Sequence, residues 1–338
     1  MQNSHLYFLL LLFLVSCSSS DPATDSTDKE SVRHDDGWHA VMASDTSKPH
    51  ARHEAAFVGI ADKYYLLGGR GIKPVDIFDS KNQTWTSGAE PPVEIHHFQP
   101  VVYQDEIYLL GAMTGGYPGE TPLPGIMIYN PAKDTWRTGA EIPPDRRRGG
   151  AGTALLNGKI YLVCGITDGH RGGHVAWFDV YDPVKNTWEQ LPDAPRPRDH
   201  FQAVVKDNRL YAMAGRTTVA ATNPFANTIG EVDVFNFTSN TWATLSDTLP
   251  THRAGNMAIA LGDDLLVLGG ESKDQLVAHS EVEALSVSTG KWRTLDSLSR
   301  GRHGTGVIHH GGQLIMASGC GNHGGSPELD DMLMLKIE

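Results

Sequence analysis

The sequence is poor in three features that mark common protein classes: cysteine, positive charge and long hydrophobic runs. Its 338 residues include three cysteines, which excludes a disulfide scaffold. Lysine and arginine total 28 against 40 aspartates and glutamates, and the net charge of −12 argues against nucleic acid as a partner. The apolar run from Leu6 to Val15 is too short to span a bilayer comfortably.

The N-terminus has the pattern of an export segment. The apolar run ends in Leu14-Val15-Ser16-Cys17, which resembles a bacterial lipobox, although only His5 stands where a Lys or Arg is usual. The resemblance implies cleavage before Cys17 and a lipid on its thiol; an ordinary secretory signal is the alternative. A polar tract follows to residue 36 and predicts a flexible tether. We therefore expect a signal peptide at 1–16, a lipidated Cys17 and tether at 17–36, and a globular domain at 37–338.

A tryptophan recurs at intervals near fifty residues. The period is marked by Trp85, Trp136, Trp188, Trp242 and Trp292, and Trp38 lies one interval earlier. Such a period in a sequence rich in short apolar strands indicates a β-propeller, with one four-stranded blade per repeat. The tryptophans are expected to pack blade on blade.

Each repeat has the same internal order. It begins with an apolar strand, followed by a tight turn such as Asn157-Gly158 and a second strand that ends in small residues. A third strand with an aromatic turn and then the Trp strand follow. This pattern resembles the Kelch repeat and implies an all-β, six-bladed propeller. The sixth repeat lacks its Trp strand, so we expect residues 38–42 to complete that blade and close the ring. Cys164 and Cys320 are expected to be buried thiols on opposite blades.

Arginine opens the first strand in five of the six repeats, and Ile95 takes this place in the second. The five are Arg52, Arg148, Arg198, Arg253 and Arg302. First strands of a propeller line its channel, so the column predicts an arginine-rich mouth that binds an anion. A purely structural role, with each guanidinium bonded to backbone carbonyls, is the alternative.

The next two positions differ between repeats, and symmetry does not explain them. They place His53, Glu54, His96, His97, His200 and His303 at the same mouth. Glu54 and His200 are the candidates for proton transfer, and the others for ligand binding, because histidine titrates near neutral pH. A histidine that merely bonds a loop is the alternative at each position.

The loops after the second strands are long and uneven, which favours recognition. One of them carries Asp168, His170 and His174, but no firm metal-ligand spacing is present, so we expect neither metal nor cofactor. His309 and His310 map to hairpin turns at the opposite face and are left out of the site.

Several functions fit this pattern. The first is an envelope module that binds an anionic small molecule, such as an acidic sugar, or an envelope protein. The second is an enzyme, because the architecture resembles that of the sialic acid mutarotases (N-acetylneuraminate epimerases). A uronate polysaccharide lyase and a protein-interaction scaffold are further alternatives. By resemblance to enterobacterial lipoproteins, Ser18 directly after the expected lipidated Cys17 favours an outer-membrane location facing the periplasm or the surface.

Overall fold

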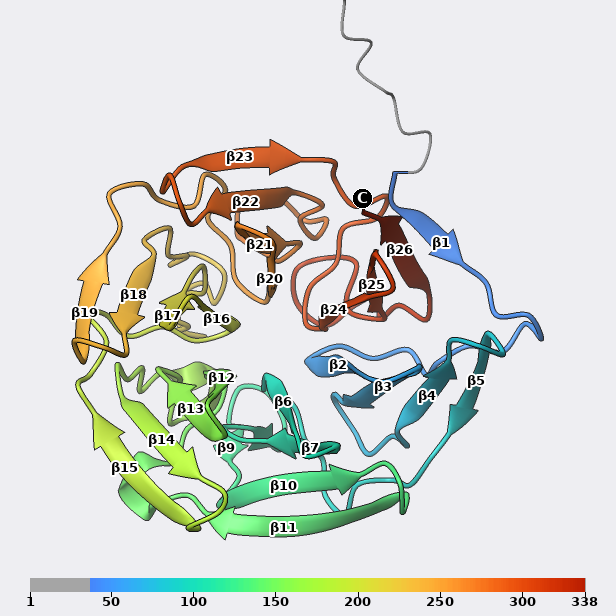
Figure 1. Ribbon diagram of the computed structural model, residues 1–338, viewed down its shortest axis with the longest axis horizontal. Helices are drawn as coiled ribbons and strands as arrows, with labels where there is room; N and C mark the ends of the chain where they lie inside the picture. The colour runs from blue at the N-terminus through green and yellow to red at the C-terminus, as the bar shows by residue number, and fades with distance from the viewer. Residues whose placement is uncertain (1–36, 338) are drawn as a thin grey trace, which may run out of the picture. The chain divides into compact units, whose positions relative to one another are not determined.

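The computed structural model describes residues 37–337. The predicted signal peptide at 1–16 and the lipidated Cys17 with its tether at 17–36 lie outside the described residues, so both stay predictions. Within 37–337 the chain forms six four-stranded antiparallel sheets, arranged as blades around a central channel (Figure 1). The predicted all-β propeller is confirmed. In this part of the chain no helix has the length and apolar character needed to cross a bilayer.

The blades follow one another around the ring, each with its first strand nearest the channel (Figure 1). Blade 1 contains β2 (Ala55–Ile60), β3 (Lys63–Gly68), β4 (Asp76–Asp79) and β5 (Thr84–Ser87). Blade 2 contains β6 (Pro100–Tyr103), β7 (Glu106–Leu109), β10 (Gly125–Asn130) and β11 (Thr135–Glu141). Blade 3 contains β12 (Gly152–Leu156), β13 (Lys159–Val163), β14 (Phe178–Asp182) and β15 (Thr187–Leu191).

The second half of the ring repeats the arrangement. Blade 4 contains β16 (Ala203–Lys206), β17 (Arg209–Ala212), β18 (Asp233–Asn236) and β19 (Thr241–Thr244). Blade 5 contains β20 (Met257–Leu261), β21 (Asp264–Leu268), β22 (Val282–Ser286) and β23 (Trp292–Leu295). Blade 6 contains β24 (Val307–His310), β25 (Gln313–Ala317), β26 (Met332–Lys336) and β1 (His39–Val41).

Short elements occupy the loops and linkers between the blade strands. A two-stranded sheet, β8 (Met113–Thr114) with β9 (Thr121–Pro122), lies between β7 and β10. Two 3-10 turns, η1 (Pro144–Arg146) and η2 (Gly169–Arg171), flank the first hairpin of blade 3. That hairpin has the predicted turn, with Asn157 and Gly158 both in the left-handed region at φ 51° and 75°.

The ring closes through the N-terminal strand. β1 pairs antiparallel with β26, and Ala40 lies opposite Leu333. The prediction that residues 38–42 supply the outer strand of blade 6 is therefore confirmed. Pairing the two chain ends covers an edge of β26 that would otherwise offer unpaired backbone groups.

The core is divided among the interfaces between blades. Six buried clusters occur in the described chain, one at each contact between neighbouring blades, and each holds one of the six periodic tryptophans. Trp38 packs between blades 5 and 6. The indole nitrogens of Trp136 and Trp188 also donate to carbonyls of Ala89 and Glu141, which precede them by one repeat. The structural role predicted for this column is confirmed.

The two cysteines in the described residues are buried and unpaired, as predicted. Burial raises the pKa of the Cys164 thiol to about 12 and that of Cys320 to about 11. Both thiols therefore stay protonated and inert at neutral pH.

We expect Trp38→Ala to lower the free energy of unfolding by about 3–5 kcal/mol, because it empties the space between blades 5 and 6 and weakens the closing strand. Denaturant unfolding measures this change. Met42→Ala is the control, since that side chain is 66% exposed and its loss should change the stability by less than about 0.5 kcal/mol. Equal effects of the two substitutions would contradict closure by Trp38.

Candidate functional site

A ring of backbone hydrogen bonds surrounds the channel at the start of the inner strands. His97 N donates to Glu54 O (3.1 Å), Gly150 N to His97 O (2.8 Å), and His200 N to Gly150 O (2.9 Å). The ring continues from Gly255 N to His200 O (2.6 Å) and from Gly304 N to Gly255 O (2.8 Å), and Ala55 N completes it at Gly304 O (3.1 Å). Blades 2 to 6 thus contribute one residue of the same register to the ring, and blade 1 contributes Glu54 with the N–H of the adjacent Ala55.

All six ring residues have a left-handed backbone, with φ between 53° and 67°. Glycine adopts this conformation freely, and blades 3, 5 and 6 have glycine here. The other three blades have Glu54, His97 and His200, each of which costs about 1–2 kcal/mol of backbone strain. Backbone strain thus occurs at three equivalent positions, and the side chains of these residues face one channel. This combination indicates a functional site.

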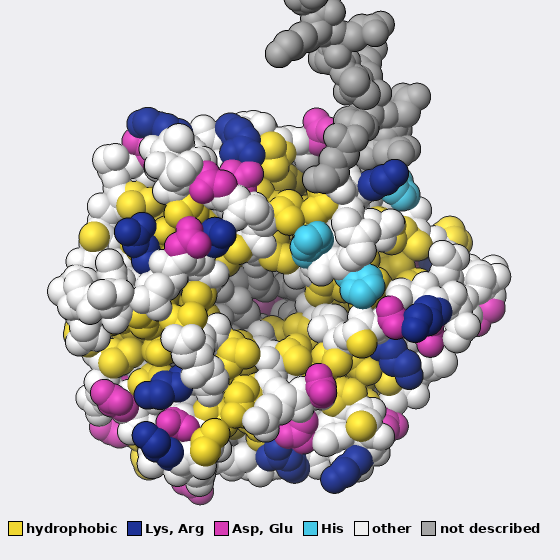
Figure 2. All heavy atoms as spheres, viewed as in Figure 1, with side chains coloured by type: hydrophobic (Ala, Val, Ile, Leu, Met, Phe, Trp, Pro, Cys, Tyr) yellow, Lys and Arg dark blue, Asp and Glu magenta, His cyan; other side chains and the backbone are white. Residues whose placement is uncertain are grey.

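The ring lies between two hollows. On one side the channel widens into a cavity of about 590 Å³, which we call the funnel. Six of the residues lining the funnel are Glu54, Arg70, Tyr117, His170, Phe225 and Glu271. On the other side a hollow of about 40 Å³ is lined by Glu54, His97 and His200. Figure 2 shows one face of the ring, hollowed at its centre, with most charged side chains toward the rim.

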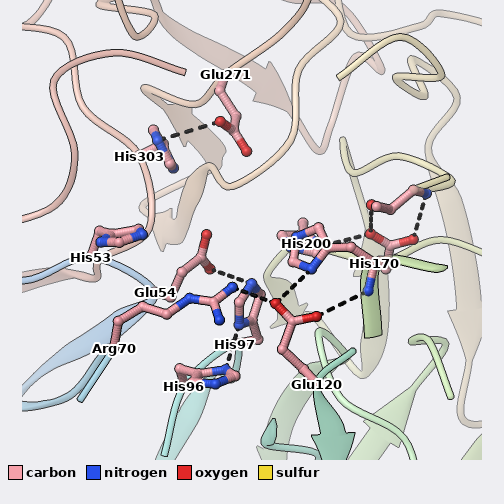
Figure 3. A network of polar contacts seen from close by, with 12 residues as sticks. His53, Glu54, Arg70, His96, His97, Glu120, His170, His200, Glu271 and His303 are labelled. Carbon is pink, nitrogen blue, oxygen red and sulfur yellow. Dashed lines mark hydrogen bonds and ion pairs between the residues drawn. The ribbon is translucent and has the colours of Figure 1, made fainter. Parts of the chain in front are cut away.

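Glu54 lies in the middle of the polar network, between the His303–Glu271 pair and a group of three histidines (Figure 3). Its Oε2 is 3.4 Å from Nε2 of His97. Burial opposes ionisation of this carboxyl, but the nearby rings of His200, His53 and His303 outweigh it and hold the pKa of Glu54 below its usual value.

The three histidines are His97, His170 and His200, and they meet ring to ring. Their ring centroids are 4.7 to 5.1 Å apart. Burial, reinforced by the neighbouring imidazoles, depresses the pKa of His97 well below its usual value. Burial and Arg216 also lower the pKa of His200. Both rings are therefore neutral at neutral pH.

Buried carboxylates stand behind these rings. His200 Nδ1 is 2.5 Å from Oδ1 of Asp199, and His170 Nδ1 is 3.0 Å from Oε1 of Glu120. Burial alone would raise the pKa of Asp199, but hydrogen bonds from His200 and Thr218 and the charge of Arg216 lower it to about 2. Opposite, burial of Glu271 is outweighed by His303 and Arg216, and its pKa is about 2.

The remaining predicted histidines reach the same region. His53 lines the funnel and its Nδ1 pairs with Glu328 (2.7 Å). His96 is buried behind His97, and its Nε2 bonds Gly115 O (3.0 Å). His303 Nε2 bonds the carbonyls of Asn322 and Gly324 (2.9 Å each). The structure therefore brings together Glu54 and all five predicted histidines, although their roles stay predictions.

The arginine column requires a correction. Arg52, Arg148, Arg198, Arg253 and Arg302 are each fully buried. Every one bonds a backbone carbonyl at the end of its blade's second strand and a carboxylate at the start of the third. Arg198, for example, donates to Ala214 O (2.7 Å) and to Asp233 (2.6 Å). These guanidinium groups are buried and paired inside the blades, with only Nε of Arg198 and of Arg302 lacking a partner, so the mouth is not lined by them.

Blade 2 supports the structural role of this column. Ile95 replaces the arginine there, and Met127 stands where the other blades have the carboxylate. Both side chains are buried in the cluster between blades 1 and 2. In blade 2 both members of the ion pair are replaced together by apolar residues. This is expected if the pair stabilises the blade and does not bind a ligand.

Four charged residues of the site were not anticipated: Arg70, Glu120, Arg216 and Glu271. Three of them had a signal, because Arg70, Arg216 and Glu271 directly follow the small pair that ends the second strand. Arg216 pairs with Glu271 (2.6 Å), and Arg70 pairs with Glu120 (2.5 Å). Glu120 lies within a long loop and had no comparable signal.

The loop after β13 contributes only part of its polar set. His170 joins His97 and His200, whereas Asp168 is 62% exposed at its side chain and His174 bonds Thr218 O. The expectation of no metal rested on spacing within this loop, and the structure assembles a different group from three blades. His309 and His310 end β24 just before its hairpin turn, and they line a separate hollow with Phe57 and Val102.

A family model for the KLHDC2/KLHL20/DRC7 Kelch-repeats domain matches residues 31–215 and 180–338. The chain belongs to the Kelch-repeat family. Kelch-like protein terF of Aspergillus terreus is 28% identical over 287 residues, covering 80% of this chain and 61% of that protein. Mouse Kelch-like protein 38 is 24% identical over 217 residues, covering 63% of this chain and 36% of that protein.

This Kelch propeller therefore spans less than two thirds of the length of those relatives. Among solved structures, that of YjhT matches with a TM-score of 0.72 at 17% identity. The match covers 86% of this chain and 96% of that chain, and it shows a shared fold.

We expect Arg253→Ile to destabilise the Kelch propeller by about 3–5 kcal/mol, because it leaves the Glu283 carboxylate buried without its cation. Adding Glu283→Met reproduces the apolar pair of blade 2 and should restore at least half of the loss. Denaturant unfolding of the single and double variants tests this. If the double variant is no more stable than Arg253→Ile, the pair does not have the purely structural role inferred here.

Backbone strain at Glu54 is tested by comparing Glu54→Gly with Glu54→Ala. Both remove the carboxylate, but only glycine relieves the left-handed conformation at φ 54°. The glycine variant should be about 1 kcal/mol more stable than the alanine variant in thermal or denaturant unfolding. Equal stabilities would show that position 54 carries no strain.

Proposed function

We propose that the funnel binds a small polyhydroxylated molecule of the saccharide class. The observation that carries this is the cavity of about 590 Å³, in which the aromatic rings of Tyr117 and Phe225 converge with Glu54, Glu94 and Arg70. A sugar ring presents C–H faces that suit aromatic surfaces and hydroxyls that need hydrogen-bonding groups. A pocket with an apolar wall and a few convergent polar groups meets both needs.

Phe225 is the better fixed of the two aromatic side chains. It stacks on the ring of His323, with centroids 4.6 Å apart and an interplanar angle of 16°. The guanidinium of Arg216 lies 5.3 Å from its centroid on the funnel side of blade 4. A preorganised aromatic surface lowers the entropy cost of binding, because its rotamer is set before the ligand arrives.

Arg70 is the candidate partner for a carboxylate on the ligand. Of the two arginines that line the funnel, Arg216 is buried and paired with Glu271, whereas the side chain of Arg70 is 22% exposed. An acidic sugar therefore fits if its carboxylate approaches Arg70. The envelope location predicted from residues 1–17 remains a prediction.

We expect Phe225→Ala to weaken the binding of both neutral and acidic sugars about tenfold or more, because it removes the stacking surface. Arg70→Gln should weaken only acidic sugars, by about 10- to 100-fold, since a charged hydrogen bond contributes about 1.5–3 kcal/mol. Glutamine can still donate to Glu120, which protects the fold. Calorimetric titration with a sialic acid, a hexuronate and a neutral hexose measures each affinity.

Arg171→Gln is the matched control, because this arginine is 61% exposed at its side chain and lies outside the funnel lining. Its affinities should equal those of the unaltered protein. Loss of acidic-sugar binding in Arg171→Gln but not in Arg70→Gln would contradict the proposed orientation. No binding of any sugar would favour a protein-interaction scaffold instead.

Catalysis on the bound sugar is the second candidate function. Glu54 is the one carboxylate of the strained ring, and its side chain is 11% exposed at the floor of the funnel. A carboxylate there can take a proton from an anomeric hydroxyl, as a mutarotase requires, with His200 nearby.

We expect the protein to accelerate anomer exchange of a sugar that it binds, and Glu54→Gln to abolish this while keeping the affinity within a few-fold. Glutamine preserves the size and the left-handed backbone and removes the base. Exchange followed by polarimetry or NMR measures the rate. Unsaturated uronate absorbance from a polysaccharide would point to a lyase, and unchanged exchange in Glu54→Gln would exclude the assigned base.

A further inference from the structure

The group formed by His97, His170 and His200 has a second property that saccharide binding does not use. One ligand atom from each residue lies within 4.8 Å of the others, and all three residues are at most 6% exposed. They come from three different blades: His97 precedes β6, His170 lies in η2, and His200 precedes β16. Figure 3 shows the rings of His97, His170 and His200 gathered beside Glu54.

Hydrogen bonds fix which nitrogen of His97 carries a proton. His96 Nε2 lies 3.0 Å from Gly115 O, and a carbonyl only accepts, so this nitrogen of His96 is the N–H. His96 Nδ1 is then an acceptor, and His97 Nδ1, 2.6 Å away, must donate to it. Nε2 of His97 is therefore a bare lone pair. It is buried without a hydrogen-bond partner.

His200 is held in the same way. His200 Nδ1 is 2.5 Å from the Asp199 carboxylate, which only accepts, so its Nε2 is a bare lone pair, again buried without a partner. Asp199 is itself fixed by the backbone N and hydroxyl of Thr218. His170 Nδ1 lies 3.0 Å from Oε1 of Glu120 but forms no hydrogen bond within the geometric limits, so only this close carboxylate orients the ring.

Histidine ligands of metal ions have this arrangement. The nitrogen away from the metal donates to a carboxylate or another acceptor, and that contact sets the tautomer and aims the free lone pair. Here His96 and Asp199 accept from the outer nitrogens of His97 and His200, and Glu120 lies beside the outer nitrogen of His170. Three neutral imidazoles with an open fourth position are a known ligand set for catalytic zinc.

A water molecule does not satisfy this group. Oε2 of Glu54 lies 3.4 Å from the bare Nε2 of His97, so this carboxylate oxygen faces the same centre as the bare lone pairs of His97 and His200 and the ring of His170. Water offers two hydrogens to at least three acceptors, His97 Nε2, His200 Nε2 and Glu54 Oε2, whereas a divalent cation can accept a lone pair from each of them. The nearby charges agree, since Glu54, Glu120 and Asp199 are opposed by two arginines, Arg70 and Arg216.

We propose that His97, His170 and His200 bind one divalent first-row transition metal ion, with the fourth position open toward Glu54 and the funnel. Bonds of about 2.1 Å to each nitrogen require nitrogens about 3.4 Å apart, so small rotations of the three rings close the site. The second group of candidate ligands, Glu54, Glu271 and His303, is less suited, because Glu271 already accepts from Arg216 and from Gly324 N. The metal site does not depend on the identity of the sugar.

The test uses the full chain, treated with chelator and then titrated with Co²⁺ or Zn²⁺. We expect one equivalent of Zn²⁺ by elemental analysis and a visible Co²⁺ spectrum of tetrahedral type. His200→Gly should lower the affinity at least 100-fold and still fold, because three blades have glycine at this position. His170→Gln, which changes a different loop, should do the same.

Asp168→Asn is the matched control, because Asp168 lies two residues from His170 but is 62% exposed at its side chain. Its metal content and Co²⁺ spectrum should match those of the unaltered protein. Asp199→Asn should weaken binding about 10- to 100-fold with the Co²⁺ spectrum retained, since Asp199 positions a ligand and is not one.

Absence of bound Co²⁺ and Zn²⁺ at micromolar free metal would overturn the proposal. Equal metal affinity in the unaltered protein, His200→Gly and His170→Gln would overturn it as well. Ammonium has four N–H donors and could satisfy the same acceptors. Binding of ammonium that excludes Co²⁺ from the site would therefore also overturn the metal proposal.

Discussion

The closed circle of backbone hydrogen bonds around the channel is the constraint on which the rest of the molecule depends. It joins the inner strands of neighbouring blades one to the next, from Glu54 through His97 and His200 and back to Ala55. Because every link requires the same left-handed backbone, the circle fixes where each blade's side chain enters the channel. Glycine would satisfy it at every position, so a larger residue there has a cost that folding does not recover.

Stability and function are carried by adjacent positions of the same strands. Each buried arginine lies two residues before a residue of the backbone ring. Its guanidinium binds both the second and the third strand of the same blade. The tryptophans act farther out, one at each interface between blades. Because the buried arginines and the tryptophans stabilise the blades away from the channel, the residues at its mouth can differ between blades. They differ at the positions of Glu54, His97 and His200, where the other three blades have glycine.

The sequence predicts the fold well, because its signals are repeated six times. The tryptophan period, the Asn157-Gly158 turn and the missing sixth Trp strand each follow from local rules that tertiary contacts do not override. The site is harder, because its members come from different blades and meet only after closure. Position in the repeat correctly predicts that Glu54 and the histidines lie at the channel. It wrongly predicts that Arg198 and the other arginines line the mouth. Sequence position shows which residues are equivalent, but it does not show which way a side chain turns.

Glu120 shows the limit most clearly, since it lies in a loop that no other blade repeats and yet supports both Arg70 and His170. The funnel's charge balance also emerges only in three dimensions. Among its lining residues, the carboxylates Glu54, Glu94 and Glu271 outnumber the arginines Arg70 and Arg216, which leaves a net charge of −1 if the histidines are neutral. Such a surface suits a neutral sugar but opposes an acidic one. A divalent cation on the three histidines changes that balance to +1, so an anionic ligand and an occupied metal site would favour each other.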